Sequence, residues 1–495
     1  MDQLEIFPVL VVVFVSYLLA YRIARRKKSP LIQEYLFAGN HPVFAVTSNI
    51  GSVFSLSIAA TALLSSGYLF GWQIIFPLMM GVISGLLLIL KLFKSEFVQQ
   101  NKIENEHDHF GGGASYLTLL RRRYGAAVFF GLGLFLLCLY LLLLAVELSV
   151  LRISISSITT LDSFDIHLIV IIILIGAFTY VFIGGYACVL LTDHFQVFVL
   201  LAFGGFGAVE MISLFKHLPA PTSSPIVGRD WILLLSLHGG VFIAAAAFFV
   251  ASTDHWVRTI GTLKVGSVRP VLIASAVLMA FGSSLPILLG SLFQSLSDTT
   301  YRDNNVSLVM IAHFLEASTY TMRFLFFMAM TAISLSTLDT YIVTVKQLYY
   351  EISIYMRARH AVLYIFEYVL KWKQIRAISL AMVLTALGLS LTIADDLVYQ
   401  VGVAALSAFI YVVPILILEI WPKILWPNNV RNANDVIVAQ SVSLVVGPMA
   451  FWLANFLIAP IAVHLYLIPV AITASVICGY GGTAAAIRAP RLLGR

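Results

Sequence analysis

The chain is built from long apolar runs that are separated by short polar segments. About thirteen of these runs reach the ~20 residues that a helix needs to cross the hydrocarbon core of a bilayer. Their centres lie near Val13, Ser57, Val82, Phe135, Ile172, Leu200, Ala245, Val277, Ser334, Val383, Ala408, Leu444 and Ala471. The pattern predicts an all-α membrane protein with about 13 transmembrane helices.

Composition and the distribution of charge agree with a membrane protein. Hydrophobic residues make up 60% of the chain and charged residues 11%, whereas about a quarter of a soluble protein is charged. Lysine and arginine gather in alternate loops, which the positive-inside rule places in the cytoplasm; these are residues 22–28, 121–123, 264–269, 357–376, 423–431 and 488–495. We therefore expect a cell-membrane protein, of a bacterial inner membrane, with an outside N-terminus and a cytoplasmic C-terminus. The net charge of +6 follows from this topology and indicates no nucleic-acid partner.

Residues typical of enzymes, cofactor sites and disulfides form no recognisable pattern. Cys138, Cys188 and Cys478 all fall inside apolar runs, without a CxxC pair or a disulfide framework. The sequence contains no nucleophile triad, nucleotide-binding loop or pair of catalytic carboxylates, so we expect neither an enzyme nor a bound cofactor. The histidines of residues 107–109 stand beside three glycines, where nothing fixes tetrahedral geometry for zinc. We interpret that segment as a solvated loop.

One polar cluster stands inside an apolar run, at residues 331–340, with the sequence TAISLSTLDT. It contains five hydroxyl side chains and one carboxylate, namely Thr331, Ser334, Ser336, Thr337, Thr340 and Asp339. Polar groups are costly in lipid and usually face a cavity, a pathway or a partner. Oxygen ligands without nitrogen or sulfur suit a hard cation such as sodium. The alternative is that the hydroxyls bond back to carbonyls one turn earlier.

Two apolar runs are rich in glycine, serine and alanine. They are SNIGSVFSLSIAATALLSSG in the second run and SLHGGVFIAAAAFFVAS in the seventh. Transporter folds built from inverted repeats interrupt the first helix of each repeat at the substrate site, whereas close packing through small residues is the alternative explanation. The spacing predicts inverted repeats at 43–215 and 216–430, preceded by an N-terminal helix and basic loop at 1–42 and followed by extra helices at 431–495.

The segment 179–196, TYVFIGGYACVLLTDHFQ, resembles a signature of the sodium/solute symporter family. Members carry Gly-Gly-x-x-Ala-Val-x-x-Thr-Asp-x-x-Gln here, and the one departure is Cys188 in place of alanine. Further fragments resemble the family in the same order, namely EYLFAGN, SSGYLFG, YLTLLRRRYG, DHWVR and AISLSTLDT. The resemblance covers roughly residues 34–421. It implies the LeuT-type fold, a 5+5 inverted repeat with one extra N-terminal and two extra C-terminal helices.

The resemblance also implies a sodium site between the first and eighth core helices. Backbone carbonyls near Ser52 and Ser55, on the interrupted first helix, would form one side of this site. The carbonyl of Ile333 and the hydroxyls of Ser336 and Thr337 would form the other side. Positions 333 and 336 are three apart and so lie on one helix face.

Asp193 matches the motif aspartate of the family, which is placed to receive sodium on its way to the cytoplasm. The alternative is a buried carboxylate that caps the N-terminus of the helix after the Gly-Gly break. In the DHWVR fragment, Asp254, His255 and Arg258 are expected to form a solvated helix end.

Substrate contacts are expected on the interrupted helix, at Asn49, Phe54 and Ser57. Phe248 falls where relatives place an aromatic that closes the inner face of the site, and ordinary packing is the alternative. The chain lacks the Asn/Glu/Gln set of sugar-transporting relatives, which disfavours a richly hydroxylated sugar. We expect sodium-coupled symport of a small organic solute across the lipid bilayer. The alternatives are a proton-coupled symporter of the same fold and a transport-deficient membrane sensor.

Overall fold

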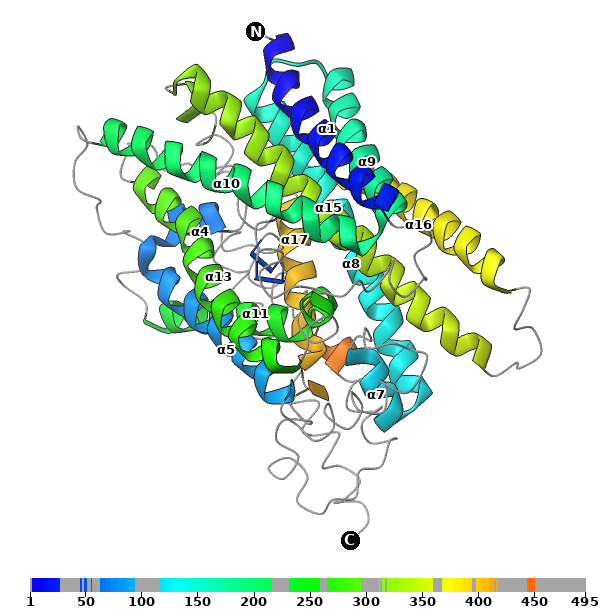
Figure 1. Ribbon diagram of the computed structural model, residues 1–495. Helices are drawn as coiled ribbons and strands as arrows, with labels where there is room; N and C mark the ends of the chain where they lie inside the picture. The colour runs from blue at the N-terminus through cyan, green and yellow to red at the C-terminus, as the bar shows by residue number, and fades with distance from the viewer. Residues whose placement is uncertain are drawn as a thin grey trace. The chain divides into compact units, whose positions relative to one another are not determined.

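Helices are the only regular elements among the described residues of this protein, for which we use a computed structural model (Figure 1). The structure describes residues 2–26, 45–46, 49–50, 55, 63–93, 116–215, 231–258, 265–294, 311, 314–316, 318–358, 367–393, 398–413, 415–416, 443–447 and 449. In this part of the chain, 6 helices are long and apolar enough to cross a membrane. The prediction of an all-α, multi-pass membrane protein is confirmed.

The helices follow the predicted apolar runs. Their bounds are α1 Asp2–Arg26, α4 Leu64–Phe70, η2 Trp72–Ile74, α5 Ile75–Phe93, α7 Tyr116–Tyr124, α8 Ala126–Ile158, α9 Ser163–Gly184, α10 Tyr186–Phe215, α11 Trp231–Ala251, α12 Thr253–Trp256, α13 Val265–Gln294, α15 Tyr320–Ala358, α16 Glu367–Thr392, α17 Val398–Ser407 and η4 Ala408–Tyr411. The predicted centres at Ser57 and Ala471 lie outside the described residues.

The chain divides into two compact units, each assembled from separate stretches. The first unit comprises Met1–Gln73, Tyr140–Ser224 and Phe281–Gly402, and the second comprises Ile74–Leu139, Pro225–Ala280 and Val403–Arg495. The predicted repeat boundaries at 43–215 and 216–430 describe a different, sequential division, and they stay a prediction.

A single residue, Gly185, separates α9 from α10. α9 ends at Gly184 and α10 begins at Tyr186. Gly185 has a φ of 61°, which residues with a side chain rarely adopt, and its N–H donates to the carbonyl of Val181 over 2.9 Å. The short connection predicted from the Gly-Gly pair is therefore confirmed. It starts a new long helix within the apolar region, so the Thr-Asp pair of the motif falls inside α10.

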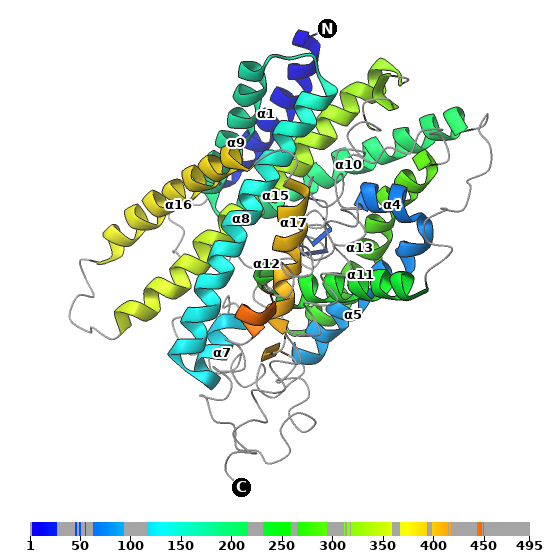
Figure 2. The ribbon, with the colours of Figure 1, turned by 180° about the vertical axis from the view of Figure 1, so that it is seen from behind.

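In the first unit, α1, α9, α10 and α15 pack against one another (Figures 1 and 2). α1 and α9 run parallel. A Cβ atom placed on Gly176 would lie 2.8 Å from Val13, and one on Gly184 would lie 3.9 Å from the carbonyl oxygen of Ala20. These two helices arise from the first and fifth apolar runs, so alternating membrane crossings require them to point the same way.

α10 and α15 run antiparallel. Residues farther along α10 contact residues earlier along α15, in the pairs Phe203–Phe326 and Gly207–Met322, and Glu210 contacts Thr319 just before α15 begins. The helices arise from the sixth and ninth apolar runs, which cross in opposite directions if crossings alternate. The directions of the packed pairs thus agree with the predicted order of spans.

In the second unit, α5 and α11 approach through small residues. A Cβ atom on Gly81 would lie 2.5 Å from the carbonyl oxygen of Phe242, and one on Gly85 would lie 2.7 Å from that of Ala246. Such separations leave no room for a side chain, so both positions need glycine for the backbones to meet. The small residues of the seventh apolar run therefore serve close packing on this face of α11.

We predict that Gly85→Leu disrupts the seam between α5 and α11. The added side chain meets backbone, which cannot turn aside, and overpacking of this kind costs about 1–3 kcal/mol. The thermal unfolding midpoint of the detergent-purified protein should fall by several degrees. Gly131→Ala on α8 is the matched control, because a Cβ there meets nothing within 4 Å. An equal midpoint for both variants would contradict the packing described.

Candidate cation-binding site

The hydroxyl cluster lies on α15, which has 39 residues. At 1.5 Å per residue such a helix is about 58 Å long, nearly twice the ~30 Å of a hydrocarbon core. All six polar side chains of residues 331–340 are at most 3% exposed. The cluster therefore faces the interior of the protein, where each polar group needs a partner.

Asp193 and Ser336 join α10 to α15. The Ser336 hydroxyl donates to Asp193 Oδ1 over 2.8 Å, and both side chains are at most 1% exposed. α10 begins at Tyr186, about two turns before Asp193, so this carboxylate lies beyond the first turn, where a cap would act. The capping alternative for Asp193 is wrong. Instead, the motif aspartate contacts the hydroxyl cluster of the facing helix.

Asp339 accepts hydrogen bonds from hydroxyls of three helices. The Tyr180 hydroxyl of α9 donates to Asp339 Oδ2, Thr192 of α10 donates to the same oxygen over 3.4 Å, and Thr340 of α15 donates to Oδ1 over 3.3 Å. Tyr180 also reaches the carbonyl of Leu335, at 3.3 Å. Two buried carboxylates, Asp193 and Asp339, thus lie where α9, α10 and α15 meet.

Tyr180 was not singled out from the sequence. It is 0% exposed, and its sequence signal is weak, because one phenol in an apolar run usually indicates packing. Its position five residues before Gly185 places it near the end of α9, close to the start of α10. Its partner Asp339 lies on α15, 159 positions away in the chain. Only the packing of α9 against α15 brings the two side chains together.

A buried positive charge lies farther along α15. Lys346 is 1% exposed, and its Nζ lies 5.5 Å from the centre of the Phe178 ring, in the geometry of a cation–π contact. Lys346 is seven positions, or about two turns, beyond Asp339. The Lys346 ammonium group is therefore separated along α15 from Asp339, which lies at the hydroxyl cluster.

Two hydroxyls of the cluster bond within α15, as the alternative interpretation proposed. Thr331 donates to the carbonyl of Phe327 over 2.8 Å, and Thr337 donates to the carbonyl of Ile333 over 3.0 Å. A hydroxyl that donates its hydrogen keeps lone pairs that can face a cation. The Ile333 and Thr337 oxygens are thus neighbouring atoms that one hard cation can share.

The predicted residues of the interrupted first core helix are described only in part. Ser55 is 0% exposed and Asn49 is 1% exposed, so both are buried polar residues. Ser52, Phe54 and Ser57 lie outside the described residues. Their roles as sodium and substrate contacts stay predictions.

Phe248 belongs to the second unit, where it lies in an aromatic cluster. Its ring centre is 5.3 Å from that of Phe249, 5.7 Å from that of His255 and 5.3 Å from that of Phe409. The ring is half-buried, and the packing role proposed as the alternative applies to it. A contact with substrate stays a prediction.

The expectation of a solvated helix end at DHWVR is wrong. Asp254, His255 and Arg258 are exposed by only 6%, 0% and 1%. α11 ends at Ala251, and the extended Ser252 leads into the short helix α12. The chain therefore interrupts its helix here and packs the polar residues inside.

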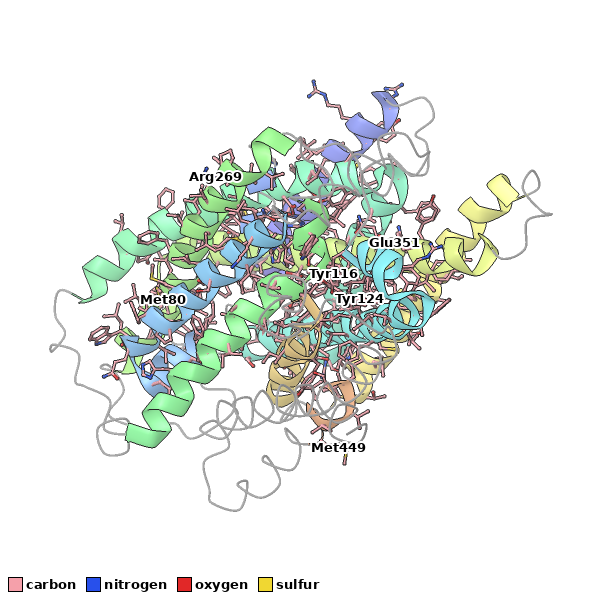
Figure 3. All side chains as sticks on the ribbon, turned by 90° about the horizontal axis from the view of Figure 1, so that it is seen from below. Met80, Tyr116, Tyr124, Arg269, Glu351 and Met449 are labelled. Atoms are coloured by element: carbon pink, nitrogen blue, oxygen red, sulfur yellow. The ribbon has the colours of Figure 1, made fainter. Side chains whose placement is uncertain are left out.

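Aromatic side chains complete the hydrogen bonds at the end of α11. The Tyr116 hydroxyl donates to the carbonyl of Ala251 over 2.7 Å, and Trp256 Nε1 donates to the carbonyl of Val250 over 2.8 Å. Tyr116, at the start of α7, is labelled in Figure 3. Carbonyls in the last turn of a helix have no partner within the helix. These two donors satisfy them and so lower the free-energy cost of burying the helix end.

Within the described part of the chain, no three histidine, cysteine, aspartate or glutamate side chains gather in a group that could hold a metal ion. The histidine loop at 107–109 lies outside it. The polar groups brought together on α9, α10 and α15 are hydroxyls, carbonyls and carboxylates. This donor set fits a weakly held hard cation such as sodium better than a transition metal.

Solved structures show the same fold. A sodium-coupled sialic acid symporter, in a substrate-bound outward-open state, matches with a TM-score of 0.66 over 98% of this chain and 97% of that chain, at 14% identity. This likeness identifies the fold as the LeuT type, as predicted. No family model and no curated protein matches the sequence.

Two more distant structures are also similar. A nucleobase-cation-symport-1 family transporter with bound bromovinylhydantoin, in a closed conformation, matches with a TM-score of 0.47 over 92% of this chain and 94% of that chain, at 14% identity. A manganese transporter from Eremococcus coleocola matches with a TM-score of 0.44 over 93% and 97%, at 13% identity.

We predict that Tyr180 and Asp339 are energetically coupled. Tyr180→Phe removes a donor from a buried carboxylate and should lower the free energy of unfolding by about 1–3 kcal/mol. In a double-mutant cycle with Asp339→Asn, the two losses should differ from additivity by about 1 kcal/mol or more. The free energy of unfolding is measured by denaturant titration for the wild type, the two single variants and the double variant.

The control cycle combines Tyr180→Phe with Thr331→Val. Thr331 bonds to its own helix at Phe327, so its loss should add to that of Tyr180 within about 0.5 kcal/mol. Additive losses in the Asp339 cycle as well would contradict the coupling.

Proposed function

We propose that this protein is a secondary active transporter of the sodium/solute symporter family, which couples sodium entry to uptake of a small organic solute. The observation that carries the proposal is the bond between Ser336 and Asp193. It joins the motif aspartate of the resembled family to the hydroxyl cluster, inside a helix pair of a LeuT-type fold. Buried carboxylates and hydroxyls in a membrane helix pair are costly unless they serve a pathway or a partner.

In the proposed mechanism, sodium binds to the carbonyl of Ile333 and the hydroxyls of Ser336 and Thr337. Carbonyls near Ser52 and Ser55 on the interrupted helix complete an all-oxygen shell. Sodium would bridge the two helices and so bind best to the outward-open state, in which both helices supply ligands. Sodium binding therefore shifts the population toward the outward-open state. The solute then binds, and both are released inward after alternating access.

Asp193 gives sodium its next ligand on the inward route. Its carboxylate accepts a hydrogen bond from Ser336. A cation that leaves the Ser336 hydroxyl would therefore find the negatively charged Asp193 next to it. The driving force is electrical and chemical, because one charge that crosses 100 mV gains ~2.3 kcal/mol. No hydrolytic step is needed.

The proposed solute class rests on the substrate contacts expected from the sequence. Asn49, Phe54 and Ser57 would line a mainly apolar site with few polar side chains, which suits a small carboxylate or amino acid bound by backbone amides. The protein would work in a bacterial inner membrane, with its N-terminus outside and its C-terminus in the cytoplasm. The competing functions are proton coupling through Asp193, Glu147 or Asp339, and ligand sensing without transport.

We predict that sodium stabilises the purified protein. A ligand at 100 times its Kd adds about 2.7 kcal/mol to the free energy of unfolding, so the thermal midpoint should rise by several degrees in sodium relative to potassium or choline at equal ionic strength. The double variant Ser336→Ala/Thr337→Ala should lose this rise, because two side-chain ligands are gone.

Thr331→Ala is the matched control, since it removes a buried hydroxyl of the same helix that bonds only within α15 in the described contacts. It should keep the sodium response. A wild type that responds equally to sodium, potassium and choline refutes sodium coupling, and a response to pH alone would favour the proton. Currents on a supported membrane, evoked by solute only in the presence of sodium, distinguish transport from sensing.

A further inference from the structure

Gln196 is a buried side chain whose polar atoms are left unsatisfied. It is 0% exposed, and among the residues that the structure describes neither its Oε1 nor its Nε2 has a hydrogen-bond partner. Buried polar side chains in proteins are nearly always hydrogen-bonded, so a buried amide without a partner among these residues calls for an explanation. A ligand that binds the amide during the working cycle would be such an explanation.

The register of α10 against α15 places Gln196 at the hydroxyl cluster. The two helices are antiparallel, with contacts that pair 193 with 336, 203 with 326, 207 with 322 and 210 with 319. Each step along α10 is therefore matched by an equal step back along α15. Gln196, three residues after Asp193, is level with Ile333, three residues before Ser336.

Gln196 also lies on the face of α10 that packs against α15. Residues of α10 that contact α15 or the residue before it lie at 192, 193, 203, 207 and 210, and position 196 is three residues after 193 and seven before 203. Position 196 lies on the same face, because it is one turn beyond both 192 and 193. The Gln196 amide therefore lies on the side of α10 that packs against α15, at the level of the carbonyl that the proposed sodium site uses.

The surrounding chemistry favours a cation over an anion or a neutral solute. The charged groups nearest to Gln196 along its own helix and at the hydroxyl cluster are the carboxylates of Asp193 and Asp339, which attract a cation and repel an anion. The side-chain carbonyl of glutamine is a hard oxygen donor, as sodium prefers. The side-chain carbonyl of Gln196 and the backbone carbonyl of Ile333 are both uncharged oxygens. Such ligands would bind a cation weakly enough to release it.

We propose that Gln196 is a ligand of the coupling cation, which its Oε1 binds between Ile333 and Asp193 on the inward route. This inference rests on the proposed sodium coupling. In it, α10 supplies two successive oxygens, first the amide of Gln196 and then the carboxylate of Asp193, one turn apart.

The test measures the sodium concentration at half-maximal thermal stabilisation, in sodium chloride against choline chloride. Gln196→Met keeps the length of the side chain and removes both polar atoms. It should raise this concentration about tenfold, the equivalent of about 1.4 kcal/mol, while the thermal midpoint without sodium stays equal or rises, because the unsatisfied amide is gone.

Ser16→Ala is the matched control. Ser16 on α1 is also 0% exposed, and its hydroxyl has no hydrogen-bond partner among the described residues. Its loss should leave the sodium midpoint unchanged. If Gln196→Met does not fold, Gln196→Asn keeps the amide but withdraws it by one methylene, and its sodium midpoint is evaluated by the same criterion.

The outcomes separate the two proposals. A rise of about threefold or more, absent in Ser16→Ala, supports the ligand role of Gln196. A smaller change, with sodium stabilisation intact, overturns it and leaves the amide as a site for water. A wild type without sodium-specific stabilisation removes the proposed coupling itself, and with it the role of Gln196.

Discussion

A buried carboxylate must find hydrogen-bond donors, and this requirement organises the helices of the first unit. Asp193 and Asp339 are both 0% exposed, and the hydroxyls that donate to them belong to α9, α10 and α15. A buried charge without partners costs several kcal/mol. Because each donor is held on its own helix, any shift in the rotation or register of α10 on α15 would break at least one bond. The polar network therefore specifies one arrangement of three apolar helices.

The second unit achieves close packing by other means. α5 and α11 meet through glycine and alanine at Gly81, Gly85 and Ala246. Dispersion contacts of this kind are insensitive to ions, whereas hydroxyl–carboxylate bonds compete directly with a cation for the same oxygens. Under the proposed sodium coupling, the polar interface between α10 and α15 would respond to the ion, whereas the small-residue seam between α5 and α11 would not.

Several features of the site were readable from the chain, and others were not. The Gly-Gly break predicted the separate start of α10, and the apolar run around TAISLSTLDT predicted a buried polar cluster. The capping alternative for Asp193 failed because α10 starts about two turns earlier than that role requires. The DHWVR segment looked solvated from its charges, but it is buried, and Tyr116 of α7 donates to the carbonyl of Ala251 just before it. Local charge does not reveal which distant element will cover it.

The sequence by itself determined the membrane class, the succession of apolar spans and the oxygen-rich chemistry, because hydrophobicity and backbone breaks act locally. Only the tertiary structure decided which oxygens meet. It paired Ser336 with Asp193 and brought Tyr180 to Asp339, and it left Gln196 buried without a partner among the described residues. These outcomes depend on the rotation and register of helices that are far apart in the chain. Those quantities are set by packing across the whole interface, which no single stretch of sequence encodes.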